Sequence, residues 1–237
     1  MIILACETST LLASVAIFKD ENLLAYKESL RQSSHSDVLN LYIDDVLKEA
    51  NLKQPGLKLS DIDLFVSGIG PGSFTGIRIS LNTIKTFAYC FNKPVLSVNS
   101  LENLAWLCPN ENKPIVSMLN AYKNMVYVAT YKKENDKLVT LKEPDVVRVQ
   151  NLNQYITENV VVVGDGYTAY AKFFDQKLNS FISRNANASD DPKALAAQHF
   201  VKQNNLQPTH WSELLPLYLR ASEAEENLKG IKYQPLV

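Results

Sequence analysis

The chain is organised around the stretch Ser67-Gly-Ile-Gly-Pro-Gly-Ser-Phe-Thr-Gly-Ile-Arg-Ile-Ser80. Residues 63–66, Asp-Leu-Phe-Val, predict a short buried strand before it. Apolar residues at helical spacing predict a helix from Phe74 to Phe91 after it. The glycine-rich stretch is therefore expected to join a strand to a helix, where backbone N–H groups and the helix dipole meet an anion or a close partner. Ser73 or Thr75 is expected to cap this helix.

The glycine spacing matches neither of the two common phosphate-binding motifs. A dinucleotide fingerprint, Gly-x-Gly-x-x-Gly, would place Thr75 at its last glycine when read from Gly70, and Ser73 when read from Gly68. A P-loop needs a lysine, which this loop lacks. Two interpretations stay open: a tight turn whose glycines permit positive φ or close packing, and a contact with an anion or a partner made by Gly70, Gly72, Ser73 and Thr75.

Composition sets limits on size, partners and compartment. The 237 residues suffice for one large domain or for two lobes. The net charge of −1 excludes a global basic field that would hold nucleic acid. Cys6, Cys90 and Cys108 form no CxxC pair and are interpreted as buried thiols in a reducing compartment. The first residues lack a basic leader, and no uncharged run approaches the roughly twenty residues of a membrane span. We therefore expect a cytoplasmic protein with no membrane contact.

The order of predicted elements repeats in the two halves of the chain. The first half reads as strands at 2–6, 14–18 and 23–27, a helix at 35–50, a strand at 63–66, the helix at 74–91 and a strand at 94–98. The second half reads as strands at 115–119, 125–131, 138–141 and 160–163, with helices at 167–174 and 192–203. This order is that of an α/β protein with an actin-like or hexokinase-like (ASKHA) fold, in which two related lobes each hold a mixed sheet and flanking helices.

The domain boundaries follow from this repeat. Residues 1–100 are predicted to form an N-terminal lobe with the glycine loop and the first two helices. Residues 101–237 are predicted to form a C-terminal lobe whose last segment can return to the first lobe. The tail from about residue 221 is charged and weakly periodic, so we expect it to be loose or partner-dependent.

Residues 68–79 resemble the signature of the TsaB (YeaZ) family, and residues 2–10, 35–36, 97–105, 121–131 and 216–220 fall in the order expected for that family. The family is the non-catalytic partner of TsaD in making N6-threonylcarbamoyladenosine in tRNA. The resemblance implies an accessory dimerisation subunit and not an enzyme in its own right. Such a subunit would bind TsaD, help recruit the ATPase TsaE, and reach tRNA only through the complex; a homodimer is a further pairing.

Catalytic chemistry is incomplete in the sequence. Glu7 is a candidate carboxylate for actin-like nucleotide chemistry, but the matching strand end in the second half is Asn120, which cannot ionise. An alternative interpretation of Glu7 is a partly exposed acid in a turn. We expect no cofactor, and any retained ATP or ADP binding, weak or only in the complex, would use Glu7, Thr8 and Ser9. Gly164-Asp-Gly166 is either a second phosphate contact or a plain strand-to-helix turn.

The resemblance also indicates that a metal site has been lost. TsaD-like enzymes carry two histidines four residues apart on a helix, on one face as metal ligands. Aligning Val98-Asn99 with that motif places Ser100 and Leu104 at the ligand positions. Leucine cannot bind a metal, so we expect no metal site and no catalytic residue. Two rival functions remain: a stand-alone nucleotide-dependent enzyme such as a small-molecule kinase, and a metallopeptidase-like protein.

The first two helices indicate where a partner binds. In the helix at 35–50, apolar residues fill one broad face and Leu41 stands alone on the opposite side. The helix at 74–91 has a core stripe and a second, uncharged stripe of Ile79, Thr83, Thr86 and Cys90. Either the second lobe or a separate subunit could cover that stripe. The resemblance implies pairing through these helices, which places Leu41, Ile79, Thr83 and Cys90 at or beside a subunit interface.

Overall fold

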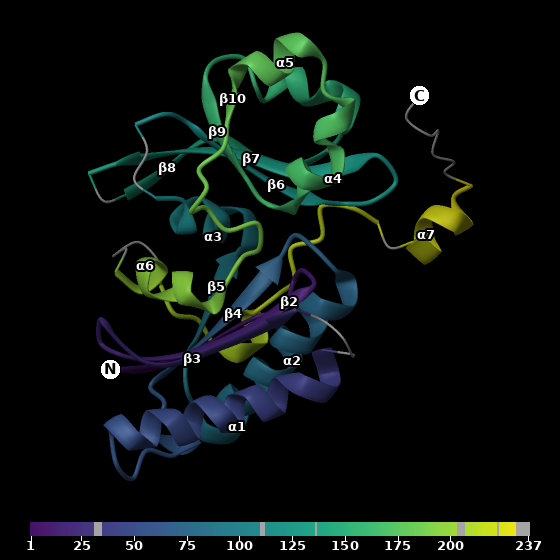
Figure 1. The fold of residues 1–237 in the computed structure, drawn as a ribbon. Coiled ribbons are helices and arrows are strands. Elements are labelled where there is room, and N and C mark those ends of the chain that lie inside the picture. The colour runs from purple at the N-terminus through teal and green to yellow at the C-terminus, as the bar shows by residue number, and fades with distance from the viewer. Residues whose placement is uncertain (31–34, 110–111, 136, 203–206, 222, 231–237) are drawn as a thin grey trace. The chain divides into compact units, whose positions relative to one another are not determined.

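A computed structural model describes residues 1–30, 35–109, 112–135, 137–202, 207–221 and 223–230 (Figure 1). The chain divides into two compact units. Unit 1 comprises Met1–Asn103 and Pro192–Leu217, and unit 2 comprises Leu104–Asp191 and the chain from Tyr218 onward. Unit 1 therefore contains a segment from the C-terminal half of the sequence, which we call the strap (Pro192–Leu217).

Unit 1 is built on a five-stranded sheet with the order β3-β2-β1-β4-β5. Its strands are β1 (Ile2–Glu7), β2 (Leu12–Lys19), β3 (Asn22–Leu30), β4 (Leu64–Gly70) and β5 (Val95–Asn99). The first three form an antiparallel meander, whereas β4 runs parallel to β1 and β5 parallel to β4. The connecting helices are α1 (His35–Lys53) and α2 (Phe74–Phe91), and α3 (Ser100–Leu107) follows β5.

The core of unit 1 lies between this sheet and helices α1 and α2, which cover one of its faces (Figure 1). The predicted apolar face of α1 and the predicted core stripe of α2 are confirmed, although Phe74 and Phe91 at the two ends of α2 are only half-buried. The buried apolar side chains that the two helices contribute to the core are Leu39, Ile43, Val46 and Ala50 on α1, and Ile77, Leu81, Ile84 and Ala88 on α2. The side chains of residues 35–37 lie outside the described residues.

Unit 2 repeats the architecture of unit 1. Its strands are β6 (Ile115–Asn120), β7 (Met125–Glu134), β8 (Lys137–Arg148), β9 (Val160–Val163) and β10 (Ile182–Ser183), in the order β10-β9-β6-β7-β8. The pairs β6–β7 and β7–β8 are antiparallel, and the pairs β6–β9 and β9–β10 are parallel. Strand for strand, this is the topology of unit 1, so the predicted actin-like fold class of two mixed sheets with flanking helices is confirmed.

The remaining elements of unit 2 are short. They are the 3₁₀ segments η2 (Val149–Gln154) and η3 (Ala171–Phe173) and helices α4 (Asp165–Tyr170), α5 (Gln176–Phe181) and α7 (Glu223–Leu228). The single helix predicted at 167–174 is in fact α4 followed by η3. Strand β8 is longer than the predicted 138–141, and α3 was absent from the predicted elements.

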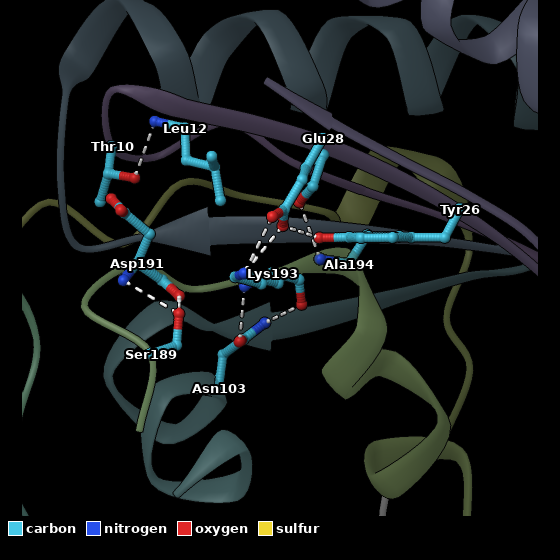
Figure 2. A network of polar contacts seen from close by, with 10 residues as sticks. Thr10, Leu12, Tyr26, Glu28, Asn103, Ser189, Asp191, Lys193 and Ala194 are labelled. Atoms are coloured by element: carbon cyan, nitrogen blue, oxygen red, sulfur yellow. Dashed lines mark hydrogen bonds and ion pairs between the residues drawn. The ribbon is translucent and has the colours of Figure 1, made fainter. Parts of the chain in front are cut away.

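The strap packs against unit 1 in two places: residues 194–196 contact strands β1 and β2, whereas residues 211–214 contact α2 and the core beneath it. It contains η4 (Ala194–Ala196), α6 (Ala197–Lys202) and η5 (Trp211–Glu213), in place of one helix at 192–203, whose last residue lies outside the described part. Figure 2 shows how the strap is anchored. The Asn103 side-chain oxygen accepts a hydrogen bond from the Lys193 amide (2.9 Å), and the Asn103 side-chain nitrogen donates one to the Lys193 carbonyl (3.0 Å). The Lys193 ammonium pairs with Glu28 (2.8 Å), and the Ala194 amide donates to the buried Ser14 hydroxyl (2.9 Å).

Candidate functional site

The end of β1 and the glycine loop meet in unit 1. The Thr8 hydroxyl donates to the Gly76 carbonyl (2.7 Å), and the Ser73 amide donates to the Ser9 carbonyl (2.7 Å). Ser73 is the N-cap of α2, because its side-chain oxygen accepts from the Gly76 amide (3.2 Å). Residues Glu7, Thr8 and Ser9 are all buried. The predicted cap is thus confirmed for Ser73, and the first turn of α2 is held directly by the end of β1.

The glycines of the loop are required by this close approach. A Cβ atom on Gly76 would lie 1.9 Å from the Thr8 carbonyl oxygen, and one on Gly72 would lie 2.2 Å from the Ser9 carbonyl oxygen. A Cβ atom on Gly68 would lie 2.1 Å from the Glu7 carboxylate. Gly70, with φ of +98°, occupies a backbone region that favours glycine. Three glycines therefore make room for the last residue of β1 and the two residues after it, which is the close-packing interpretation of the loop.

Glu7 is the last residue of β1 and is 1% exposed, so its interpretation as a partly exposed turn acid is wrong. Its carboxylate accepts from the Ser9 amide (2.8 Å) and from the Ser100 hydroxyl at the start of α3 (3.2 Å). Burial raises the pKa of Glu7, and the hydrogen bonds from Ser9 and Ser100 oppose that rise. The contact with Ser100 has no signal in the sequence, because Glu7 ends β1 whereas Ser100 begins α3 after β5, and β4 lies between these two strands in the sheet.

The loop residues named from the sequence lie in different environments. The amide and hydroxyl of Ser73 are used in the bonds to Ser9 and Gly76, while Thr75 is exposed. The loop is also held from the strap, because the Leu217 amide donates to the Ile69 carbonyl (2.8 Å). The polar groups of Ser73 therefore serve the fold of unit 1 itself.

The exposed residues of α1 include charged side chains such as Asp44 and Lys48, whereas α2 exposes an uncharged stripe at residues 86, 89 and 90. Leu41 is 61% exposed, and Thr86, Tyr89 and Cys90 are also exposed. The interpretation of Cys90 as a buried thiol is wrong, whereas Cys6 and Cys108 are buried. Ile79 and Thr83 are half-buried, and Ile79 packs partly against the core of unit 1. Tyr89 stacks edge-on against Trp211 of the strap, with 5.3 Å between ring centroids.

Unit 2 has its own polar cluster at the end of β6. The Asp165 carboxylate accepts from the Asn120 amide (2.8 Å), and the Asn120 side chain accepts from the Tyr170 hydroxyl (3.1 Å). A Cβ atom on Gly164 would lie 2.0 Å from the Met118 carbonyl oxygen, so this turn is also packed against its neighbouring strand. Burial, reinforced by Asp191 and Asp190, raises the pKa of Asp165 to about 6. Asn120 thus has an ionisable neighbour that the alignment of strand ends did not identify.

The raised pKa of Asp165 predicts a pH-dependent stability. The folded chain binds this proton more readily than the unfolded chain, whose Asp has a pKa of 3.8, so stability is gained as the pH falls from about 6 to about 4 and is lost as it rises. Asp165→Asn keeps an oxygen for the Asn120 amide. Because asparagine does not titrate, only the wild type gains stability as the pH falls. We expect the free energy of unfolding of the variant, taken relative to that of the wild type, to fall by up to about 3 kcal/mol between pH 8 and pH 4 in urea unfolding.

The matched control for this prediction is Glu158→Gln, which removes a carboxylate from an exposed position of unit 2. Its difference from the wild type should stay constant over the same pH range. A carboxyl carbon NMR titration of the folded protein gives the direct test. A midpoint near 4 for Asp165 would contradict the prediction.

The tail from residue 221, which the sequence pattern predicts to be loose, contains helix α7 and a buried acid. Glu226 is 2% exposed and pairs with Arg220 and Lys123, with 2.6 Å between Arg220 Nη2 and Glu226 Oε2 and 3.1 Å between Lys123 Nζ and Glu226 Oε2. Arg220 also donates to the Ala121 carbonyl. The sequence analysis did not predict this cluster. The one signal for it in the sequence is that Arg220 precedes Glu226, in a short helical segment, by six residues.

The positions aligned with metal ligands are both buried in α3. Ser100 is engaged with Glu7, and Leu104 has no exposed surface. Within the described ranges, no group of three or more His, Cys, Asp or Glu is placed so that it could hold a metal ion. In the same part of the chain, none of the helices has the length and apolar character needed to cross a membrane.

Comparison with known proteins shows which family the chain resembles. A family model described as TsaD, tRNA N6-adenosine threonylcarbamoyltransferase, matches residues 29–228. The tRNA threonylcarbamoyladenosine biosynthesis protein TsaB of Escherichia coli (strain K12) is 27% identical over 240 residues, which cover 97% of this chain and 99% of the relative. The protein of the same name from Bacillus subtilis (strain 168) is 26% identical over 230 residues, covering 95% of this chain and 96% of the relative.

A solved structure gives the same fold. YeaZ from Pseudomonas aeruginosa superposes with a TM-score of 0.77 at 24% sequence identity, covering 92% of this chain and 99% of that chain. Together with the near-complete coverage of the TsaB relatives, this agrees with the resemblance of residues 68–79. The chain belongs to the TsaD family and, within it, to the TsaB (YeaZ) type.

Proposed function

We propose that this chain is a non-catalytic accessory subunit in the synthesis of N6-threonylcarbamoyladenosine in tRNA. The observation that carries the proposal is the match over nearly the whole length of both chains to proteins named for tRNA threonylcarbamoyladenosine biosynthesis. A TsaD-like partner would supply the catalytic residues and the metal. In this chain Leu104, whose side chain cannot coordinate a metal, stands at one of the two ligand positions.

In this proposal the chain acts by docking. Helices α1 and α2 present Leu41 and Cys90 to solvent, with Ile79 and Thr83 beside them. The exposed, uncharged stripe of α2, together with Leu41 of α1, is a surface that can pack against the helices of another subunit. The partner is a TsaD-like protein, a second copy of the chain is an alternative occupant, and the pair recruits a TsaE-like ATPase. With a net charge of −1, the chain reaches tRNA only through the complex.

The test is reconstitution of the tRNA modification in vitro. A TsaD-like protein, a TsaE-like ATPase, threonylcarbamoyl-adenylate and unmodified tRNA are combined with and without this chain. We expect modified adenosine to form only when the chain is present, because the partner needs the shared interface to hold its competent conformation. Equal modification without the chain would refute the accessory role.

One feature favours a second function, a stand-alone nucleotide-dependent enzyme. Each unit has a carboxyl with a raised pKa beside a glycine turn: the buried Glu7 next to Gly68, and the half-buried Asp165 next to Gly164. Carboxyls with a shifted pKa are typical of functional sites in general. ATP hydrolysis or sugar phosphorylation by the purified chain would support this function. We expect neither, and we expect ADP to bind only weakly or in the complex.

A further inference from the structure

Three consecutive polar residues, Glu7, Thr8 and Ser9, are buried at the end of β1, with exposed fractions of 1%, 0% and 2%. Burial of polar side chains is unfavourable unless hydrogen bonds compensate for the lost water. We call these residues the β1 clamp. Their partners on the next elements show what the buried polar groups are used for.

Two contacts of the β1 clamp reach the first turn of α2. The Thr8 hydroxyl donates to the Gly76 carbonyl (2.7 Å), and the Ser9 carbonyl accepts from the Ser73 amide (2.7 Å). Backbone contact at this distance is possible only because residues 72 and 76 lack a Cβ atom. The clamp therefore holds the start of α2 at its N-cap, Ser73, and three residues further along at Gly76.

The third residue of the clamp secures the other two. The Glu7 carboxylate accepts from the Ser9 amide (2.8 Å), which fixes the turn that follows β1, and from the Ser100 hydroxyl of α3 (3.2 Å). The direction of α2 is thus set by a side chain and a backbone carbonyl that are themselves held in place. Ile79 and Thr83 follow Gly76 on the same helix by three and seven residues.

We propose that Thr8 is a positioning residue for partner binding, which fixes the first turn of α2 and through it the side of α2 that carries Ile79 and Thr83. This inference rests on the proposed docking through α1 and α2. In this inference the buried polar residues at the end of β1 support the helix that forms the subunit interface, and they do not bind a nucleotide. The mechanism is one hydrogen bond that joins two elements 68 residues apart in sequence.

The test compares Thr8→Val with Thr8→Ser. Valine keeps the shape of threonine and removes the donor, whereas serine keeps the donor and removes a methyl group. Because one buried hydrogen bond is lost, we expect Thr8→Val to weaken binding to a TsaD-like protein about fivefold by isothermal calorimetry. Thr8→Ser should restore most of the wild-type affinity.

Ser14→Ala is the matched control for a general loss of stability. It removes the hydroxyl that accepts from the Ala194 amide (2.9 Å), a buried hydrogen bond of unit 1 that does not touch α2. We expect wild-type affinity for this variant. Thr8→Val with wild-type affinity, or Ser14→Ala with the same loss as Thr8→Val, would overturn the proposal.

Hydrogen exchange separates this proposal from the proposed function. In the free chain, Thr8→Val should raise the exchange rate of the amides of residues 77–79, and Ser14→Ala should not. If the wild type fails to bind a TsaD-like protein, the proposed function fails, and the exchange rates still decide whether Thr8 holds α2. Unchanged exchange in Thr8→Val refutes the positioning role whatever the partner does.

Discussion

The double variant Leu41→Asp/Cys90→Asp is expected to abolish the complex with a TsaD-like protein, with affinity reduced at least about 100-fold. Both side chains are exposed on the helices, so aspartate at these positions is solvated in the free chain. At an interface each new carboxylate would be buried without a partner, and one such charge costs roughly 2–5 kcal/mol. Size-exclusion co-elution and calorimetry measure the loss.

The choice of Leu41 and Cys90 follows from burial. Ile79 packs partly against the core of unit 1, so aspartate there would disturb the fold as well as the interface. Leu141→Asp is the matched control, because Leu141 is an exposed leucine on β8 of unit 2. We expect it to co-elute with the partner as the wild type does. A double variant that co-elutes unchanged would show that α1 and α2 do not form the interface.

The fold was largely predictable because its signals are local. The meander of β1 to β3 follows from short apolar strands with brief turns, and the core stripe of α2 follows from residues three and four apart. The cap at Ser73 was also visible, since serine before an apolar helix satisfies a free amide. The same five-strand order in both units explains why the order of predicted elements repeats in the two halves of the sequence.

The site was predictable only in part because its contacts are long-range. Glu7 meets Ser100 across 93 residues, and Thr8 meets Gly76 across 68. The glycine pattern signals close packing but does not name the neighbour that requires it. The buried acid Glu226 lies in a charged helix of six residues, which resembles a solvated tail until Arg220 and Lys123 are placed beside it. Exposure of Cys90 contradicts the usual burial of free cysteine, since it lies on the face of α2 opposite the core.

Gly76→Ala should reverse the usual effect of this substitution in a helix. Replacing a helical glycine by alanine normally stabilises a protein by up to about 1 kcal/mol. Here the new Cβ atom would lie 1.9 Å from the Thr8 carbonyl oxygen, a backbone atom of the residue that directly follows β1, the central strand of the unit 1 sheet. Residues 8 and 76 must move apart, with strain and the loss of the buried hydrogen bond from Thr8. We expect a loss of about 3 kcal/mol, which lowers the melting temperature by roughly 6–12 °C.

Asn82→Ala supplies the control for this prediction, because Asn82 is exposed on the same helix and alanine there changes only helix propensity. Its melting temperature should match or slightly exceed that of the wild type. The two variants therefore separate the intrinsic preference of α2 for alanine from its contact with β1. If Gly76→Ala instead melted at or above the wild-type temperature, β1 and α2 could not be in contact at this point, and Thr8 could not position the helix.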